Sequence, residues 1–126
     1  MKIRTLIGMA VLAAASSLSH AVDLKPYSAP VVQEAQQAGK PYAIHFHADW
    51  CPTCRVQEKA FQSMKDDKEV DVPIFVANYD NEKELKKKLN IRTQSTVVVF
   101  RGAEEKARVA GETDSQKLKA VLKKAL

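Results

Sequence analysis

Two cysteines separated by two residues constrain this chain more than any other feature. Cys51-Pro52-Thr53-Cys54 follows an apolar run typical of a strand and precedes a segment with helical spacing. Unpaired backbone N–H groups and the helix dipole stabilise an anion at a helix N-terminus. The pattern therefore predicts that Cys51 is a thiolate, the nucleophile of thiol–disulfide exchange. Cys54, one helical turn further on, is predicted to be the resolving thiol.

Three other uses of a cysteine pair fit the sequence less well. A disulfide across two intervening residues closes a loop too short to stabilise a fold much. A structural zinc site usually needs four protein ligands, but the chain has only two cysteines. Covalent haem attachment needs a histidine directly after the second cysteine, where this sequence has Arg55. Redox exchange is therefore the chemistry that the pair indicates.

Hydrophobic spacing predicts alternating helices and strands around this motif. Helices are expected at residues 30–37, 52–65, 82–89 and 115–126, and strands at residues 42–48, 74–77, 96–100 and 106–110. The helix that starts at Pro52 is expected to face the core with Val56, Ala60, Phe61 and Met64. Residues 22–29 are expected to be an irregular lead-in. This order predicts one α/β domain, in which helices cover both faces of a central mixed sheet.

The N-terminus has the three-part pattern of a secretory signal peptide. Lys2 and Arg4 precede an uncharged apolar run at residues 6–15. This run is shorter than the roughly 20 residues that a membrane-spanning helix needs. Small residues then predict cleavage after Ala21, so we expect residues 1–21 to be removed. The mature protein is expected to be periplasmic or secreted.

The mature chain, residues 22–126, is predicted to be a single domain with a modest positive charge. Subtracting Lys2 and Arg4 from 20 basic residues leaves 18 against 15 acidic residues, or +3. In the lysine run at residues 86–88, Lys86 and Lys88 each lie four residues after a glutamate. This i,i+4 spacing of opposite charges predicts a solvated helix face. No nucleic-acid partner and no membrane span after cleavage are expected.

The segment from Ala48 to Arg55, with its Trp-Cys-x-x-Cys motif, resembles the active-site segment of the thioredoxin superfamily. It is particularly similar to the thioredoxin-like domains of bacterial periplasmic disulfide-interchange proteins. The similarity continues through Asn90-Ile91-Arg92, Thr96 to Phe100 and Gly111, and covers residues 30–126.

This resemblance implies a thioredoxin-like fold and an oxidoreductase that uses no bound cofactor or metal. It implies protein thiols and disulfides as substrates, a redox partner protein that supplies or accepts electrons, and a role in reduction or isomerisation. It also implies that Trp50, Pro52 and Thr53 belong to the surface on which substrates dock.

Ser95 departs from the family pattern, because thioredoxins have a cis-proline at this position before the apolar strand. A cis bond before a residue other than proline costs about 2.5–4 kcal/mol, so a trans bond is predicted before Ser95. In the family this loop pairs with the substrate chain in a strand-like manner. Gln94 and Ser95 are expected to inherit that substrate-binding role with altered geometry.

His45 is a second departure, because thioredoxins bury a carboxylate at this position beneath the second cysteine. One hypothesis makes His45 the general base toward Cys54, since imidazole titrates near neutral pH. The alternative is a histidine satisfied by hydrogen bonds within a semi-buried strand. His47 lies two residues further along and therefore on the same strand face.

A metal-binding function is the alternative to redox exchange. Cys51, Cys54 and either His45 or His47 would supply the soft ligands that Cu(I) or zinc prefers. The cis-proline of thioredoxin-like proteins is thought to discourage metal binding, and this chain lacks it. The alternative is therefore a Cu(I) or zinc binding or delivery protein.

Overall fold

A computed structural model describes residues 22–126; the predicted signal peptide lies outside the described residues. Five strands and four helices follow one another in the order β1 (Leu24–Pro26), α1 (Ala29–Gln37), β2 (Pro41–His47), α2 (Pro52–Ser63), β3 (Ile74–Asn78), α3 (Lys83–Leu89), β4 (Thr96–Arg101), β5 (Glu104–Ala110) and α4 (Ser115–Lys123). All eight elements expected from residue 30 onward are present, with ends shifted by a few residues. The expected α/β fold is therefore confirmed.

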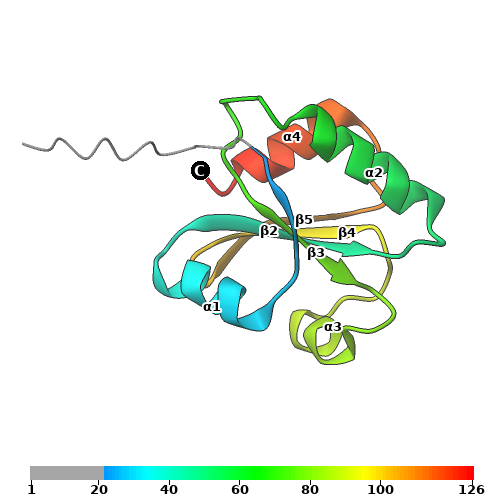
Figure 1. The fold of residues 1–126 in the computed structure, drawn as a ribbon, viewed down its shortest axis with the longest axis horizontal. Helices are drawn as coiled ribbons and strands as arrows, with labels where there is room; N and C mark the ends of the chain where they lie inside the picture. The colour runs from blue at the N-terminus through cyan, green and yellow to red at the C-terminus, as the bar shows by residue number, and fades with distance from the viewer. Residues whose placement is uncertain (1–21) are drawn as a thin grey trace, which may run out of the picture.

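The sheet is mixed and has β2 at its centre. The strand order is β1-β3-β2-β4-β5. β2 runs parallel to β3 and antiparallel to β4, which forms an antiparallel hairpin with β5. Helices α2 and α4 cover one face and α1 and α3 the other (Figure 1). This arrangement confirms the predicted layers.

Two apolar cores form because successive side chains of a strand point to opposite faces of the sheet. On the α2/α4 face, Phe61, Leu118 and Leu122 pack against strand residues that include Ala43, Ile74 and Val97. On the α1/α3 face, β2 contributes Tyr42, Ile44 and Phe46. His45 therefore points toward α2, and its ring packs edge-on against Phe61 with centroids 5.3 Å apart.

The expectation of an irregular lead-in at residues 22–29 is wrong. β1 adds a parallel edge strand to β3, with hydrogen bonds from Ile74 N–H to Asp23 O (2.8 Å) and from Tyr27 N–H to Val76 O (2.9 Å). A strand of three residues that ends in proline has no alternation to reveal it. Its formation depends on the partner strand, which lies some fifty residues away in the sequence.

The predicted core face of α2 is also partly wrong. Val56 is 46% exposed, whereas Gln57 is completely buried. The buried residues of α2 are Cys54, Gln57 and Phe61, which follow helical spacing. The inner face therefore carries the polar Gln57, whereas the apolar pattern had favoured Val56. Among residues 22–126, no helix has the length and apolar character that crossing a bilayer requires.

Candidate active site

Cys51 lies at the junction where the central strand gives way to α2. Its backbone N–H donates to Ala48 O (3.0 Å), which closes the turn after β2. The Cys51 sulfur caps the helix by accepting the backbone N–H of Cys54 at 3.2 Å. Pro52 occupies the first helical turn, where its missing N–H leaves no hydrogen bond unmade. This geometry places the sulfur at the positive end of the helix dipole, as the sequence predicted.

One hydroxyl group bridges the two sulfurs. Ser95 Oγ lies 3.1 Å from Cys51 Sγ and 3.0 Å from Cys54 Sγ. Neither cysteine is in a disulfide, so the structure shows the dithiol form. Cys51 is only 1% exposed and Cys54 is fully buried. A substrate sulfur therefore reaches Cys51 only when groups that cover this sulfur shift.

The surroundings separate the acidities of the two thiols. Burial raises the pKa of the Cys51 thiol, but hydrogen bonds from Cys54, Ser95 and backbone N–H groups outweigh burial and lower the pKa overall. Burial raises the pKa of the Cys54 thiol, and its hydrogen bond to the Cys51 sulfur raises it further. Cys51 is thus the more acidic of the two thiols, the property required of the nucleophile.

Ser95 has a left-handed backbone, with φ of 60°. No peptide bond among residues 22–126 is cis, so the predicted trans bond before Ser95 is confirmed. The Ser95 N–H donates to Phe46 O (2.9 Å), and its carbonyl accepts the Gly111 N–H (3.0 Å). Both backbone polar groups are therefore used within the protein, and the Ser95 side chain, not its backbone, faces the reactive sulfurs.

Gln57 is the residue that sequence reasoning missed. Its amide nitrogen donates to Ser95 O (3.0 Å) and to Glu112 O (2.9 Å), and its amide oxygen lies 2.8 Å from His45 Nε2. Because the oxygen can only accept, His45 Nε2 carries a proton and donates it. The only signal in the sequence was a position one helical turn after Cys54, on the inner face of α2.

His45 is buried on β2 and is hydrogen-bonded to Gln57. Burial lowers its pKa to about 4, against an opposing influence of the hydrogen bond to Gln57, so the ring is neutral at neutral pH. Its Nδ1 has no hydrogen-bond partner among the described residues. The described contacts connect His45 to the sulfurs through Gln57 and Ser95. The general-base role toward Cys54 stays a hypothesis without a direct contact.

His47 points toward the surface side of the same strand face. Its Nε2 lies 3.2 Å from Glu58 Oε2 and its Nδ1 lies 3.8 Å from Asp49 Oδ1. Within residues 22–126, no group of three or more His, Cys, Asp or Glu side chains is arranged to hold a metal ion. The Cu(I) or zinc alternative therefore gains no support from the arrangement of these histidines.

The expected docking residues surround the buried cysteine pair at the surface. Trp50 is 56% exposed, and its indole N–H donates to Asp80 Oδ2 at 2.8 Å, which fixes the ring beside the motif. Pro52 is exposed, and Thr53 and Gln94 are half-buried. Each of these four residues is adjacent in the chain to Cys51, Cys54 or Ser95, and their role in binding stays a prediction.

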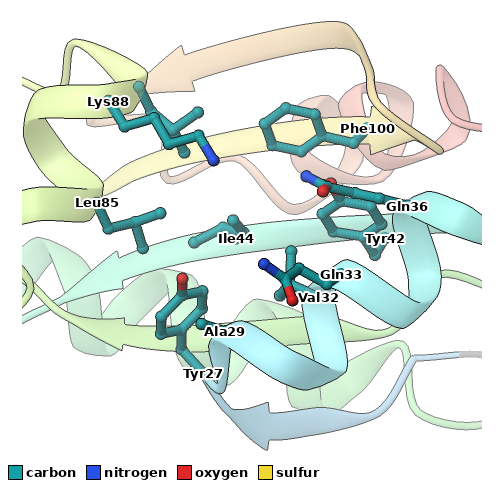
Figure 2. A pocket seen from close by; sticks show the side chains of 11 residues that line it. Tyr27, Ala29, Val32, Gln33, Gln36, Tyr42, Ile44, Leu85, Lys88 and Phe100 are labelled. Carbon is teal, nitrogen blue, oxygen red and sulfur yellow. The ribbon is translucent and has the colours of Figure 1, made fainter.

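A small cavity lies away from the cysteines, on the α1/α3 face of the sheet. Its walls include Tyr27, Gln36, Tyr42, Leu85 and Lys88 (Figure 2). The cavity volume is about 70 Å³, and Gln36 closes one side by donating to the Tyr42 hydroxyl (3.1 Å). Cofactor pockets typically have roughly 300–1,000 Å³. The cavity is a packing gap between two helices.

Comparisons with known proteins agree with the geometry of the cysteine pair. The thioredoxin family model matches residues 26–124. Thioredoxin from Rickettsia bellii is 30% identical over 74 residues, which cover 59% of this chain and 70% of that protein. The crystal structure of Trxlp from Edwardsiella tarda has a TM-score of 0.75 and 31% identity, covering 79% of this chain and 98% of that one. The chain therefore belongs to the thioredoxin family, whose members are thiol–disulfide oxidoreductases that act on protein thiols and disulfides.

Proposed function

We propose that this protein is an exported thiol–disulfide oxidoreductase that reduces or isomerises disulfides in protein substrates. The observation that carries the proposal is the Cys51 sulfur at the N-terminus of α2, within 3.2 Å of the Cys54 N–H and 3.1 Å of the Ser95 hydroxyl. Both groups stabilise a sulfur anion. Cys54, whose pKa is raised by burial, keeps its proton until the mixed disulfide has formed.

The reaction proceeds in two exchanges between sulfur atoms. The Cys51 thiolate attacks one sulfur of the substrate disulfide, and the other substrate sulfur leaves as a thiolate. Cys54 then attacks Cys51, which releases the second substrate sulfur and leaves a Cys51–Cys54 disulfide. A separate redox protein restores the dithiol in this proposal.

The first residues that the structure describes are part of the packed domain. Val22 is only 2% exposed and belongs to the core on the α2/α4 face, and Asp23 O accepts the Ile74 N–H. The support for cleavage comes from the sequence: Lys2 and Arg4, the uncharged apolar run at residues 6–15 and the small residues that precede Val22. We propose that the mature protein starts at Val22 and acts in the periplasm or outside the cell.

Turnover of a protein disulfide tests the redox part of the proposal. Reduction of insulin disulfides by the protein, driven by dithiothreitol, is expected to be lost in Cys51→Ser. The matched control is Ser63→Ala, which removes an exposed side chain at the far end of the same helix and is expected to retain wild-type turnover. Wild-type protein that gives no more reduction than dithiothreitol alone contradicts the proposal.

The mass of the exported protein tests the location. When the full chain is expressed in a Gram-negative host, the periplasmic fraction is expected to contain protein that begins at Val22. Recovery of uncleaved protein starting at Met1 in the cytosol alone overturns export without affecting the redox assay.

The direction of electron flow needs its own measurement. Equilibration of the Cys51–Cys54 pair against glutathione gives its reduction potential. A strongly reducing potential is expected for a reductase. A markedly oxidising potential indicates a disulfide donor and contradicts the proposed direction.

A further inference from the structure

We propose that Ser95 is a catalytic residue whose hydroxyl is a hydrogen-bond bridge, stabilising the sulfur anion first at Cys51 and then at Cys54. Gln57 is the positioning residue that holds this bridge in place. The inference rests on the proposed function, since it assigns a step of the same exchange reaction. It concerns a residue that stands where thioredoxins have a proline, which has no hydroxyl to offer.

The geometry allows one hydroxyl to serve both sulfurs at once. A serine hydroxyl has one proton to donate and two lone pairs that accept. With Cys51 as the anion, Ser95 Oγ–H donates to Cys51 Sγ across 3.1 Å. Ser95 Oγ also lies 3.0 Å from Cys54 Sγ, where its lone pairs can accept the Cys54 S–H in place of the Cys51 sulfur. The donor and acceptor roles match the charge distribution, because Cys51 is the more acidic thiol and Cys54 the less acidic one.

The Ser95 hydroxyl donates to a different sulfur as the negative charge moves from Cys51 to Cys54. When Cys51 attacks, a bond forms from its sulfur to one substrate sulfur, the substrate S–S bond breaks, and the other substrate sulfur leaves with the electron pair. Cys51 is then neutral, and the departing thiolate takes up the proton that Cys54 gives up. Ser95 Oγ–H can now rotate to donate to the Cys54 anion.

The second exchange completes the balance. Cys54 Sγ bonds to Cys51 Sγ, the bond from Cys51 to the substrate breaks, and the second substrate sulfur leaves as a thiolate that equilibrates with solvent. Two electrons have passed from the protein dithiol to the substrate disulfide. No further oxidant or reductant is needed within this half-reaction.

Gln57 fixes the position of Ser95 from the inner face of α2. The Ser95 carbonyl accepts from Gln57 Nε2 (3.0 Å) and from the Gly111 N–H (3.0 Å), while the Ser95 N–H donates to Phe46 O. Gln57 is itself held by His45 and by the Glu112 carbonyl. Every hydrogen-bonding atom of the Gln57 amide is engaged, so its side chain cannot turn without breaking a buried contact.

The titratable groups around the bridge come from three elements. Cys51 and Cys54 lie at the start of α2, and His45 on β2 reaches the bridge through Gln57 as a neutral ring. Tyr79, directly after β3, packs against the two cysteines, and the neighbouring Asp80 accepts the Trp50 indole N–H. No charged side chain is among the groups that lower the pKa of Cys51, so the hydrogen bonds set it.

The test is a titration of the Cys51 thiolate by its absorbance near 240 nm in the reduced protein, compared among wild type, Ser95→Ala and Ser95→Gly. Ser95→Ala removes the hydroxyl but leaves a Cβ in the left-handed region, where it is unfavourable. Ser95→Gly removes both the hydroxyl and the Cβ. Both variants are expected to raise the apparent pKa of Cys51 by about one unit, a tenfold loss of thiolate below that pKa. Unchanged titrations in both variants, or a rise in Ser95→Ala alone, overturn the proposal.

Gln57→Met tests the positioning role, because it keeps a side chain of similar length without hydrogen bonds. We expect a smaller rise in the Cys51 pKa than in Ser95→Ala, and no additional rise when the two substitutions are combined. Additive shifts, or a variant that loses stability with an unchanged titration, reduce Gln57 to a structural residue. The titration needs no substrate, so its outcome is separate from the insulin assay that tests the proposed function.

Discussion

Two residues other than glycine adopt a left-handed backbone among residues 22–126, and their surroundings are opposite. Asn90, with φ of 58°, is exposed and directly follows α3. Ser95, with φ of 60°, is 3% exposed and contacts both cysteines. The two residues share a backbone conformation within one short segment, but different interactions stabilise it.

The conformation of Asn90 follows from its immediate neighbours. Its N–H donates to Lys87 O (3.2 Å), and the Ile91 N–H donates to Lys86 O (2.8 Å), which satisfies the last carbonyls of α3. Asparagine tolerates this backbone better than most residues. The partners of Ser95 are Phe46 on β2, Gln57 on α2 and Gly111 directly after β5. A left-handed backbone at Ser95 is therefore imposed by tertiary contacts.

Gln57→Ala is expected to have the largest effect on stability, because it removes a side chain that holds the Ser95 carbonyl from another element. The buried His45 N–H loses its acceptor, two carbonyls lose a donor, and a cavity forms. Together these changes are expected to lower the free energy of unfolding by about 3–4 kcal/mol. Urea unfolding measures the loss. Gln62→Ala, at an exposed position of the same helix, is the control and is expected to stay within about 0.5 kcal/mol.

Acidification tests His45, which is hydrogen-bonded to Gln57. His45 has a pKa of about 4 in the folded protein against 6.5 ordinarily, so the unfolded chain binds more protons between these values. Stability is expected to be unaffected by His45 above pH 6.5, to fall by about 3 kcal/mol as pH drops toward 4, and then to level off. Urea unfolding from pH 7 to 5 should show the first part of this slope. A His45→Gln variant with the same slope as wild type contradicts the assignment.

Comparing glycine with alanine at position 95 separates the cost of a Cβ at positive φ from the effect of losing the hydroxyl. Ser95→Gly and Ser95→Ala both lack Oγ, but only alanine retains the cost of a Cβ in the left-handed region. Ser95→Gly is expected to be more stable than Ser95→Ala by about 1 kcal/mol in thermal or urea unfolding. Equal stabilities indicate that position 95 is not held at positive φ in solution.

Glycine at position 90 is expected to give the smallest effect. Asn90→Gly is expected to change the free energy of unfolding by no more than about 0.5 kcal/mol, since asparagine already suits a helix end. The Cys51 titration is expected to stay as in wild type. A shift in that titration contradicts the distinction between a local and a tertiary left-handed residue.

Sequence reasoning succeeded where neighbouring residues decide the structure. Apolar periodicity predicted the core strands, because burial of one or both sheet faces requires it. The position of Cys51 at a helix start followed from the strand, the motif and Pro52. The trans bond before Ser95 followed from the cost of a cis bond at a residue other than proline.

Sequence reasoning failed where partners come from distant parts of the chain. β1 exists because β3 supplies its hydrogen bonds, and three residues carry no pattern of their own. Gln57 was not among the residues predicted to face the core, because a polar residue gives no sign of burial when every one of its polar atoms is paired. The direction of the Ser95 side chain depends on a φ value that no neighbouring residue indicates.

Trapping the reaction after its first exchange identifies the nucleophile most directly. Reduced Cys54→Ser protein is mixed with a disulfide-bonded protein substrate, and the products are separated without reductant and analysed by mass spectrometry. We predict a covalent adduct through Cys51 that dithiothreitol releases and that wild type does not accumulate. An adduct absent from Cys54→Ser, together with continued disulfide reduction by Cys51→Ser, would contradict Cys51 as the attacking sulfur.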